Sequence, residues 1–248
     1  MNANYWKTYL KTRRGLTLTL FLTGLLVLLH FIFIGMVFIA TMMMDESPDI
    51  ELTYSNIDTL RQRAEGLGFL GYIWVICIIY EVAYLQKNQL FQRFIVQGKT
   101  RFEWGVFLIT NIVAASLFLA LFNSAVVNLM AIGMYDIYNL TSFYHLLTTW
   151  TSLLYLGLFG ILLALTIPSS TTAFLALGWF VLELILLNNN TLNQALFDIP
   201  AYFPYNAIAK WCYAAEPSFS QNLTVCIYFV AFVSLIFFTL NKKAYVSK

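Results

Sequence analysis

The chain has 248 residues, of which 60% are hydrophobic and only 10% are charged, and its formal net charge is +2. Soluble domains carry about 25% charged residues, so this composition excludes an ordinary water-soluble globular protein and indicates a membrane protein. The cysteines Cys77, Cys212 and Cys226 follow no metal-ligand spacing. Neither a zinc site nor a disulfide framework is therefore expected.

Six long apolar stretches predict six transmembrane helices. A helix needs about 20 residues to cross about 30 Å of hydrocarbon. Lipid offers the backbone no hydrogen-bond partners, so apolar runs of this length without alternation form helices. The first stretch is too long for the core of a signal peptide and is expected to stay in the membrane. The stretches cover residues 16–41, 67–85, 104–130, 143–167, 172–187 and 223–240.

The basic residues indicate on which side of the membrane each segment lies. Eleven of the fourteen Lys and Arg residues precede the first stretch, separate the second from the third, or follow the sixth. With six crossings these segments share one side, and the positive-inside rule makes that side the cytoplasm. The other three, Arg61, Arg63 and Lys210, share the opposite side with most of the acidic residues. The expected fold class is therefore an all-α membrane protein with six transmembrane helices and both termini cytoplasmic.

Residues 1–15 indicate a helix that lies in the cytoplasmic interface. Tyr5 and Trp6 fall on one helical face, and Lys7 and Lys11 fall on the opposite one. Such a helix would hold its aromatic rings at the depth of the lipid headgroups and its cations in water. A basic tail that only serves the orientation rule stays as the alternative.

The loop between the second and third stretches, residues 86–103, is longer than a helical hairpin needs. Its apolar residues, among them Phe91 and Phe94, recur at helical spacing, with Arg93 and Gln97 on the other face. This pattern predicts a short amphipathic helix. Such a helix either rests on the membrane or docks into a groove of a soluble partner.

The end of this loop carries a stop signal and a start signal. Gly98 favours a helix end, and Thr100 with Glu103 predicts a capping box that opens the third stretch. The run Gly98, Lys99, Thr100 is no phosphate-binding loop, because it lacks the upstream glycine and the preceding strand. ATP, if the protein uses it, would bind to another chain.

The segment between the fifth and sixth stretches, residues 188–221, lies outside by the charge rule but is too apolar for a solvated loop. Pro200, Pro204 and Pro217 divide it into two helices that are each too short to span the membrane. We expect a re-entrant hairpin in the outer leaflet, where irregular backbone must be covered by protein or by a watery cavity. This hairpin is a candidate lid or exit lining.

Two carboxylates lie within the apolar stretches, Glu81 and Glu183. A charge at the middle of the bilayer costs about 2.5 to 3.5 kcal/mol, so each is a candidate for a gate or a substrate path. Glu81 could reach Lys87 or a partner chain, and Glu183 could reach Lys210. Packing or anchoring is the alternative for both.

These features together resemble the permease subunit of ABC-2-type ATP-binding-cassette transporters. Residues 91–103 resemble the coupling-helix region of that family, where a basic and apolar helix ends in Gly and a hydroxyl residue with Arg opens the next span. The pairs Ile199–Pro200 and Phe203–Pro204 resemble the proline-bearing end of its outer hairpin. The resemblance covers the whole chain and rests on topology more than on single residues.

The resemblance implies one permease domain over residues 1–248 that forms the substrate path of an ATP-driven exporter. It implies a second permease, as a homodimer or a sister subunit, and two copies of an ATPase chain that bind ATP and Mg. The chain itself would bind no cofactor, metal or nucleic acid, and it would lie in the lipid of a bacterial inner membrane. The expected ATPase contacts are Phe91, Arg93, Phe94, Gln97, Lys99 and Arg101, and the expected gate or path residues are Glu81, Glu183, Pro200 and Pro204.

Two other function classes stay open. A secondary transporter would work without an ATPase, but the internal inverted repeat typical of such proteins is not evident in the sequence. An intramembrane metalloprotease would need clustered His and carboxylate residues, whereas His30 and His145 are the only histidines. Copurification with a nucleotide-binding partner would separate these classes.

Overall fold

The computed structural model of the chain describes residues 69–87, 100–135, 143–167, 169, 171–188 and 219–242. It also describes scattered positions between 21 and 39, all helical, and residues 203, 204 and 207. Nearly all of these residues are in α-helices, and none of them is in a strand. The helical fold class is thereby confirmed. The predicted interfacial helix over residues 1–15 lies outside the described residues.

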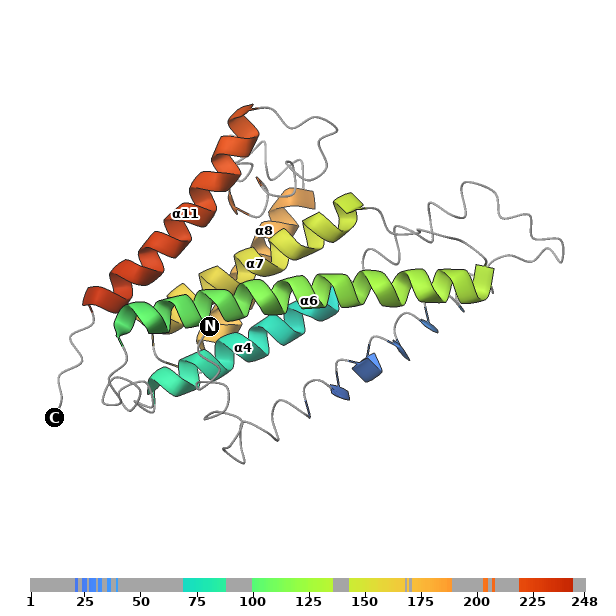
Figure 1. Cartoon of the computed structure of the whole chain (residues 1–248), viewed down its shortest axis with the longest axis horizontal. Helices are drawn as coiled ribbons and strands as arrows, with labels where there is room; N and C mark the ends of the chain where they lie inside the picture. The colour runs from blue at the N-terminus through green and yellow to red at the C-terminus, as the bar shows by residue number, and fades with distance from the viewer. Residues whose placement is uncertain are drawn as a thin grey trace. The chain divides into compact units, whose positions relative to one another are not determined.

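Five long helices coincide with five of the six predicted stretches (Figure 1). The largest difference between a predicted and an observed boundary is at the end of α6, which continues to Tyr135. The same helix begins at Arg101, within the predicted loop. The five helices are α4 (Phe69–Lys87), α6 (Arg101–Tyr135), α7 (Phe143–Thr166), α8 (Thr172–Asn188) and α11 (Phe219–Lys242).

Within the described residues, three helices are long and apolar enough to cross a membrane, over Arg101–Gly133, Leu146–Thr166 and Phe219–Lys242. Two shorter apolar helical segments, Tyr72–Gln86 and Thr172–Glu183, accompany them. At 1.5 Å per residue the whole of α8 is about 25 Å long, which is near the lower limit for a span. The chain is therefore a helical protein with membrane-spanning character.

The described helices divide into two compact units. The first holds the start of α4, up to Trp74, and the second half of α6, from Leu121. In that half of α6, Asn128 donates a hydrogen bond from Nδ2 to Oγ of Ser124 at 3.5 Å. The second unit holds the rest of α4 and α6 together with α7, α8 and α11.

In the second unit, α7 is the central helix, and it packs against both α8 and α11. Two glycines let α7 approach other helices closely: a Cβ on Gly157 would lie 2.7 Å from Cγ2 of Ile112 on α6, and a Cβ on Gly160 would overlap Ile79 on α4. In its most apolar window, 61% of α7 is buried, against 17% of α11. The apolar side chains that α11 exposes are suited to lipid or to another protein surface.

Candidate functional site

Glu183 on α8 is the centre of a buried polar cluster. Its side chain has no exposed surface. The Tyr155 hydroxyl on α7 donates a hydrogen bond to Oε1 of Glu183 at 2.6 Å. The Trp179 indole N–H donates to the same oxygen and also lies 3.2 Å from the Tyr155 hydroxyl oxygen. Three side chains from two helices thus satisfy one another inside an apolar environment.

The α7–α8 hairpin brings these three residues together. Trp179 and Glu183 are four residues apart on α8, so they share one helical face. Hydrogen bonds from Ser169 N–H to the Ile167 carbonyl (2.7 Å) and from Thr172 Oγ1 to the same carbonyl (2.7 Å) hold the turn. In an antiparallel hairpin, residues equally distant from the turn lie side by side. Tyr155 and Glu183 are each fourteen residues from Ser169 (169 − 155 = 14 and 183 − 169 = 14).

Aromatic rings surround the polar centre. The ring of Tyr155 lies 5.7 Å from that of Phe232 on α11, and the ring of Phe159 on α7 lies 6.3 Å from that of Trp179. Phe203, in the segment before α11, packs on Trp179 at 5.6 Å between ring centroids. We define the Glu183 cluster as Tyr155, Phe159, Trp179, Glu183, Phe203 and Phe232.

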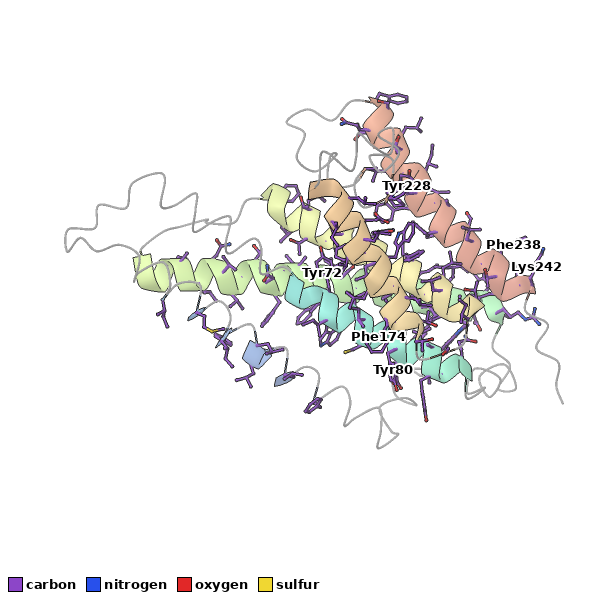
Figure 2. All side chains as sticks on the ribbon, turned by 180° about the vertical axis from the view of Figure 1, so that it is seen from behind. Tyr72, Tyr80, Phe174, Tyr228, Phe238 and Lys242 are labelled. Carbon is purple, nitrogen blue, oxygen red and sulfur yellow. The ribbon has the colours of Figure 1, made fainter. Side chains whose placement is uncertain are left out.

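Tyr228 extends the aromatic surface toward the other end of α11. It precedes Phe232 by one helical turn and faces α7 and α8 (Figure 2). Phe238 and Lys242 lie farther along the same helix, where the Lys242 ammonium sits 4.5 Å from the centre of the Phe238 ring. The helix α11 therefore carries aromatic groups both at its middle and near its C-terminal end.

The chemistry that the cluster offers is hydrogen bonding and cation attraction. A carboxylate accepts hydrogen bonds and attracts positive charge, and aromatic faces add negative potential. Among the described residues no three His, Cys, Asp or Glu side chains come together as a metal site. The cluster is thus suited to recognise a polar or charged group within the membrane.

A second arrangement joins the start of α6 to the end of α11. The Arg101 guanidinium donates to the backbone carbonyl of Asn241 at 2.8 Å. The rings of Phe102 and Phe237 are stacked with centroids 5.1 Å apart. A Cβ on Gly105 would lie only 2.6 Å from the Phe237 ring, so α6 and α11 are in close contact here. We call this set of contacts the α6–α11 joint.

The predicted capping box is confirmed. The Thr100 backbone N–H donates to Oε2 of Glu103 at 3.0 Å, and the Glu103 backbone N–H donates to the Thr100 hydroxyl at 3.1 Å. The reciprocal bonds satisfy two of the backbone donors left without partners at the start of a helix. The helix α6 therefore begins with a fixed geometry at the end of the 86–103 segment.

Four of the predicted site residues are among the described ones: Glu81, Arg101, Glu183 and Pro204. Glu183 lies at the centre of the buried cluster, where Tyr155 and Trp179 contact it, while the expected partner Lys210 lies outside the described residues. Glu81 is 8% exposed on α4, two residues after Ile79. Arg101 faces α11. The remaining coupling residues, Phe91, Arg93, Phe94, Gln97 and Lys99, lie outside the described residues, as does Pro200.

Pro204 lies at the start of a helical turn. The Phe203 carbonyl accepts a hydrogen bond from the Ala207 N–H at 2.9 Å, and Pro204 is the first residue inside that turn. Proline suits this position because its missing N–H would have no helical partner there. The residue just before this proline, Phe203, is the one that contacts Trp179.

Sequence reasoning overlooked the partners of Glu183. Two signals were present: the four-residue spacing of Trp179 and Glu183, and the symmetry of Tyr155 and Glu183 about the turn. Phe203 and Phe232 left no comparable signal, because their contacts depend on how separate segments pack.

Comparison with protein-family models, with curated proteins and with solved structures found no match to this chain.

Proposed function

We propose that this chain is the membrane-spanning permease subunit of an ATP-driven ABC-2-type transporter that exports its substrate. In this proposal the chain crosses a bacterial inner membrane six times with both termini in the cytoplasm. It pairs with a second permease and with two ATPase chains, which bind ATP and Mg. The segment 86–103 acts as the coupling helix that docks onto an ATPase.

The α6–α11 joint is the observation that carries the proposal. Residues 88–99 lead directly into Thr100 and Arg101, where α6 is capped by its own side chains and bonded to α11. Because a capped helix moves as a rigid element, a push on the preceding segment would reach two spans at their shared end. This is the mechanical connection that a coupling helix requires.

The joint also connects that end of the molecule with the Glu183 cluster. Phe237 and Asn241 take part in the joint, while Phe232 of the same helix contacts Tyr155. Phe232 and Asn241 are nine residues apart, or about 14 Å along the helix. A tilt of α11 imposed at the joint would therefore change the contacts around Glu183 as well.

Truncation of Phe91 and Phe94 together to Ala tests the coupling assignment. If the two aromatics are buried anchors in the ATPase, the double variant should lose roughly 2 to 4 kcal/mol of association free energy. The measurement is the amount of ATPase that copurifies with the chain, followed by its hydrolysis rate. Insertion into the membrane should be unchanged.

Two further variants make this test specific. Phe143→Ala, at an aromatic that is 72% exposed at the start of α7, should leave copurification unchanged. Arg101→Ala should retain the ATPase but lower transport per ATP hydrolysed, because the Arg101 guanidinium faces Asn241 within this chain. A Phe91/Phe94 variant that retains a full complement of ATPase and normal hydrolysis would remove the coupling role from residues 86–103.

A further inference from the structure

The Glu183 cluster combines an anionic group with several aromatic faces. Glu183 is fully buried, and Tyr155 is 1% exposed. The rings of Phe159 and Phe232 lie 6.1 Å apart in an edge-on arrangement, so the two helices α7 and α11 present their rings at an angle to each other. Phe203 closes the side on which Trp179 lies. Rings from three segments thus lie against Tyr155 and Trp179, the two donors that contact the carboxylate.

Both components of the cluster favour positive charge and disfavour negative charge. The face of an aromatic ring carries negative potential and attracts ammonium groups within about 6 Å of its centre. Glu183 has no exposed surface, so the field of an ionised carboxylate at this position would be weakly screened. Apolar substituents on such a ligand would contact the rings, and their burial would not remove water from polar groups.

In the described state, dipoles occupy the position of a cation. The indole N–H of Trp179 and the hydroxyl of Tyr155 both direct their positive ends to Oε1 of Glu183. Trp179 is the more accessible of the two donors, because 38% of its surface is exposed. Phe203 packs against its ring. Movement of Trp179 together with Phe203 would open the carboxylate to an incoming group.

We propose that the Glu183 cluster binds the organic ammonium group of a ligand that carries apolar substituents. The ammonium group takes the place of the Trp179 N–H beside Oε1, and the rings of Phe159 and Phe232 contact its substituents. This inference rests on the proposed function in one respect: the ligand is a transport substrate if the chain is a permease. Binding itself requires no ATPase and is measured on this chain alone.

Equilibrium binding of benzyltrimethylammonium to the purified full-length chain in lipid nanodiscs tests the proposal. The neutral isostere neopentylbenzene, in which carbon replaces the charged nitrogen, reports binding to an apolar surface alone. The wild-type chain should bind the cation saturably, and neopentylbenzene should not displace it. Glu183→Gln should weaken binding by about tenfold or more, because the amide can still accept both hydrogen bonds but carries no charge.

A second variant measures the contribution of the aromatic rings to binding separately from that of the charge and from any effect on folding. Phe232→Leu retains the carboxylate and both of its hydrogen bonds, and it should weaken binding roughly three- to tenfold. The control Phe174→Leu changes an aromatic on α8 that is 69% exposed and outside the cluster, and it should bind as the wild type does. Phe174 lies apart from Tyr228 (Figure 2).

Three outcomes would overturn the proposal: no saturable binding to the wild-type chain, equal affinity in Glu183→Gln, or equal displacement by the neutral isostere. Each of them would leave the ATPase copurification test unaffected. Conversely, loss of the coupling assignment would not alter the affinity of the chain for the cation. The two proposals therefore fail independently.

Discussion

At the scale of the residue, the carboxylate of Glu183 is compensated by two side-chain dipoles. Withdrawing an ionised carboxylate from water costs several kcal/mol even after the protein relaxes. A hydrogen bond to a charged group contributes about 1.5 to 3 kcal/mol, so the donors Tyr155 and Trp179 together offset much of that cost. An apolar residue of similar size would pack at this position without the desolvation penalty of a carboxylate. Glu183 is therefore a candidate for a functional residue.

The variant Tyr155→Phe tests how much the Tyr155 hydroxyl contributes. It removes the donor at 2.6 Å from Oε1 but keeps the ring that packs on Phe159 and Phe232. Interhelical hydrogen bonds in membranes contribute less than in isolation, so the loss should be about 1 to 2 kcal/mol. The measurement is the unfolding free energy of the purified chain in a denaturing-detergent titration.

The control for this prediction is Tyr80→Phe. Tyr80 is 38% exposed on α4 (Figure 2), and removal of its hydroxyl should change the unfolding free energy by less than about 0.5 kcal/mol. Equal effects of the two variants would mean that the Tyr155–Glu183 hydrogen bond makes no specific contribution to stability.

At the scale of the element, α7 is the central helix of the second unit because small residues on its surface let other helices approach it closely. Gly157 and Gly160 lie three residues apart and so share one side of α7. Small residues let helices approach closely in a membrane, where packing and hydrogen bonds drive association in place of the hydrophobic effect. On this side Ile112 of α6 and Ile79 of α4 fill the space that a side chain on α7 would need.

Substitution of Gly160 by Ala should therefore destabilise the chain. The added Cβ would overlap Ile79, which is fully buried and has no open space to move into. Overpacking of this kind costs about 1 to 3 kcal/mol. Thermal unfolding in detergent micelles measures the loss. Adding Ile79→Val should restore only part of it, because Val lacks Cδ1 but retains Cγ1, which lies 2.5 Å from the added Cβ.

The matched control is Gly178→Ala on α8. A Cβ there meets no atom within 4 Å, so the substitution should be neutral or stabilise the helix by up to about 1 kcal/mol through propensity alone. If both glycine variants were equally stable, the close approach of α7 and α4 would not contribute to the fold.

The elements that could be predicted from the sequence are those that local physics determines. Lipid forces each apolar run to satisfy its own backbone, so hydropathy places α7 and α8 within one residue of their observed ends. The capping box at Thr100 and Glu103 is likewise local, since its partners are three residues apart. Such features need no knowledge of the packing.

The partners of the functional candidates could not be predicted in the same way. Glu183 is conspicuous as a charge in an apolar run, but its contacts with Tyr155 and Phe232 depend on which faces of three helices meet. Hydrophobic periodicity identifies that face poorly in α7, α8 and α11, because all sides of a membrane helix are apolar. Arg101 shows the same limit: its guanidinium bonds to a carbonyl of α11 that lies 140 residues along the chain, so no local pattern indicates this contact.

At the scale of the whole molecule, the length of α6 constrains the proposed topology. Its 35 residues form one continuous helix, which at 1.5 Å per residue is about 52 Å long. A bilayer with its headgroups is about 40 to 45 Å thick. A single crossing by α6 would therefore bring residues just before Thr100 and just after Tyr135 into water on opposite sides.

Single cysteine substitutions, labelled in intact cells with a membrane-impermeant maleimide, test the six-span arrangement. The background lacks the native cysteines at positions 77, 212 and 226, so that only the introduced thiol can react. The opposite ends of α6 are the decisive pair: Asp136→Cys should react and Gln97→Cys should not, because the positive-inside rule places the Gln97 side in the cytoplasm. Permeabilised cells provide the control, in which all variants should label. Reaction of Gln97→Cys in intact cells as readily as Asp136→Cys would reject both the orientation and the docking of residues 86–103 on a cytoplasmic ATPase. The full set comprises Asp49→Cys, Asp136→Cys and Asn193→Cys, expected to label, and Lys11→Cys, Gln97→Cys and Lys243→Cys, expected to be protected.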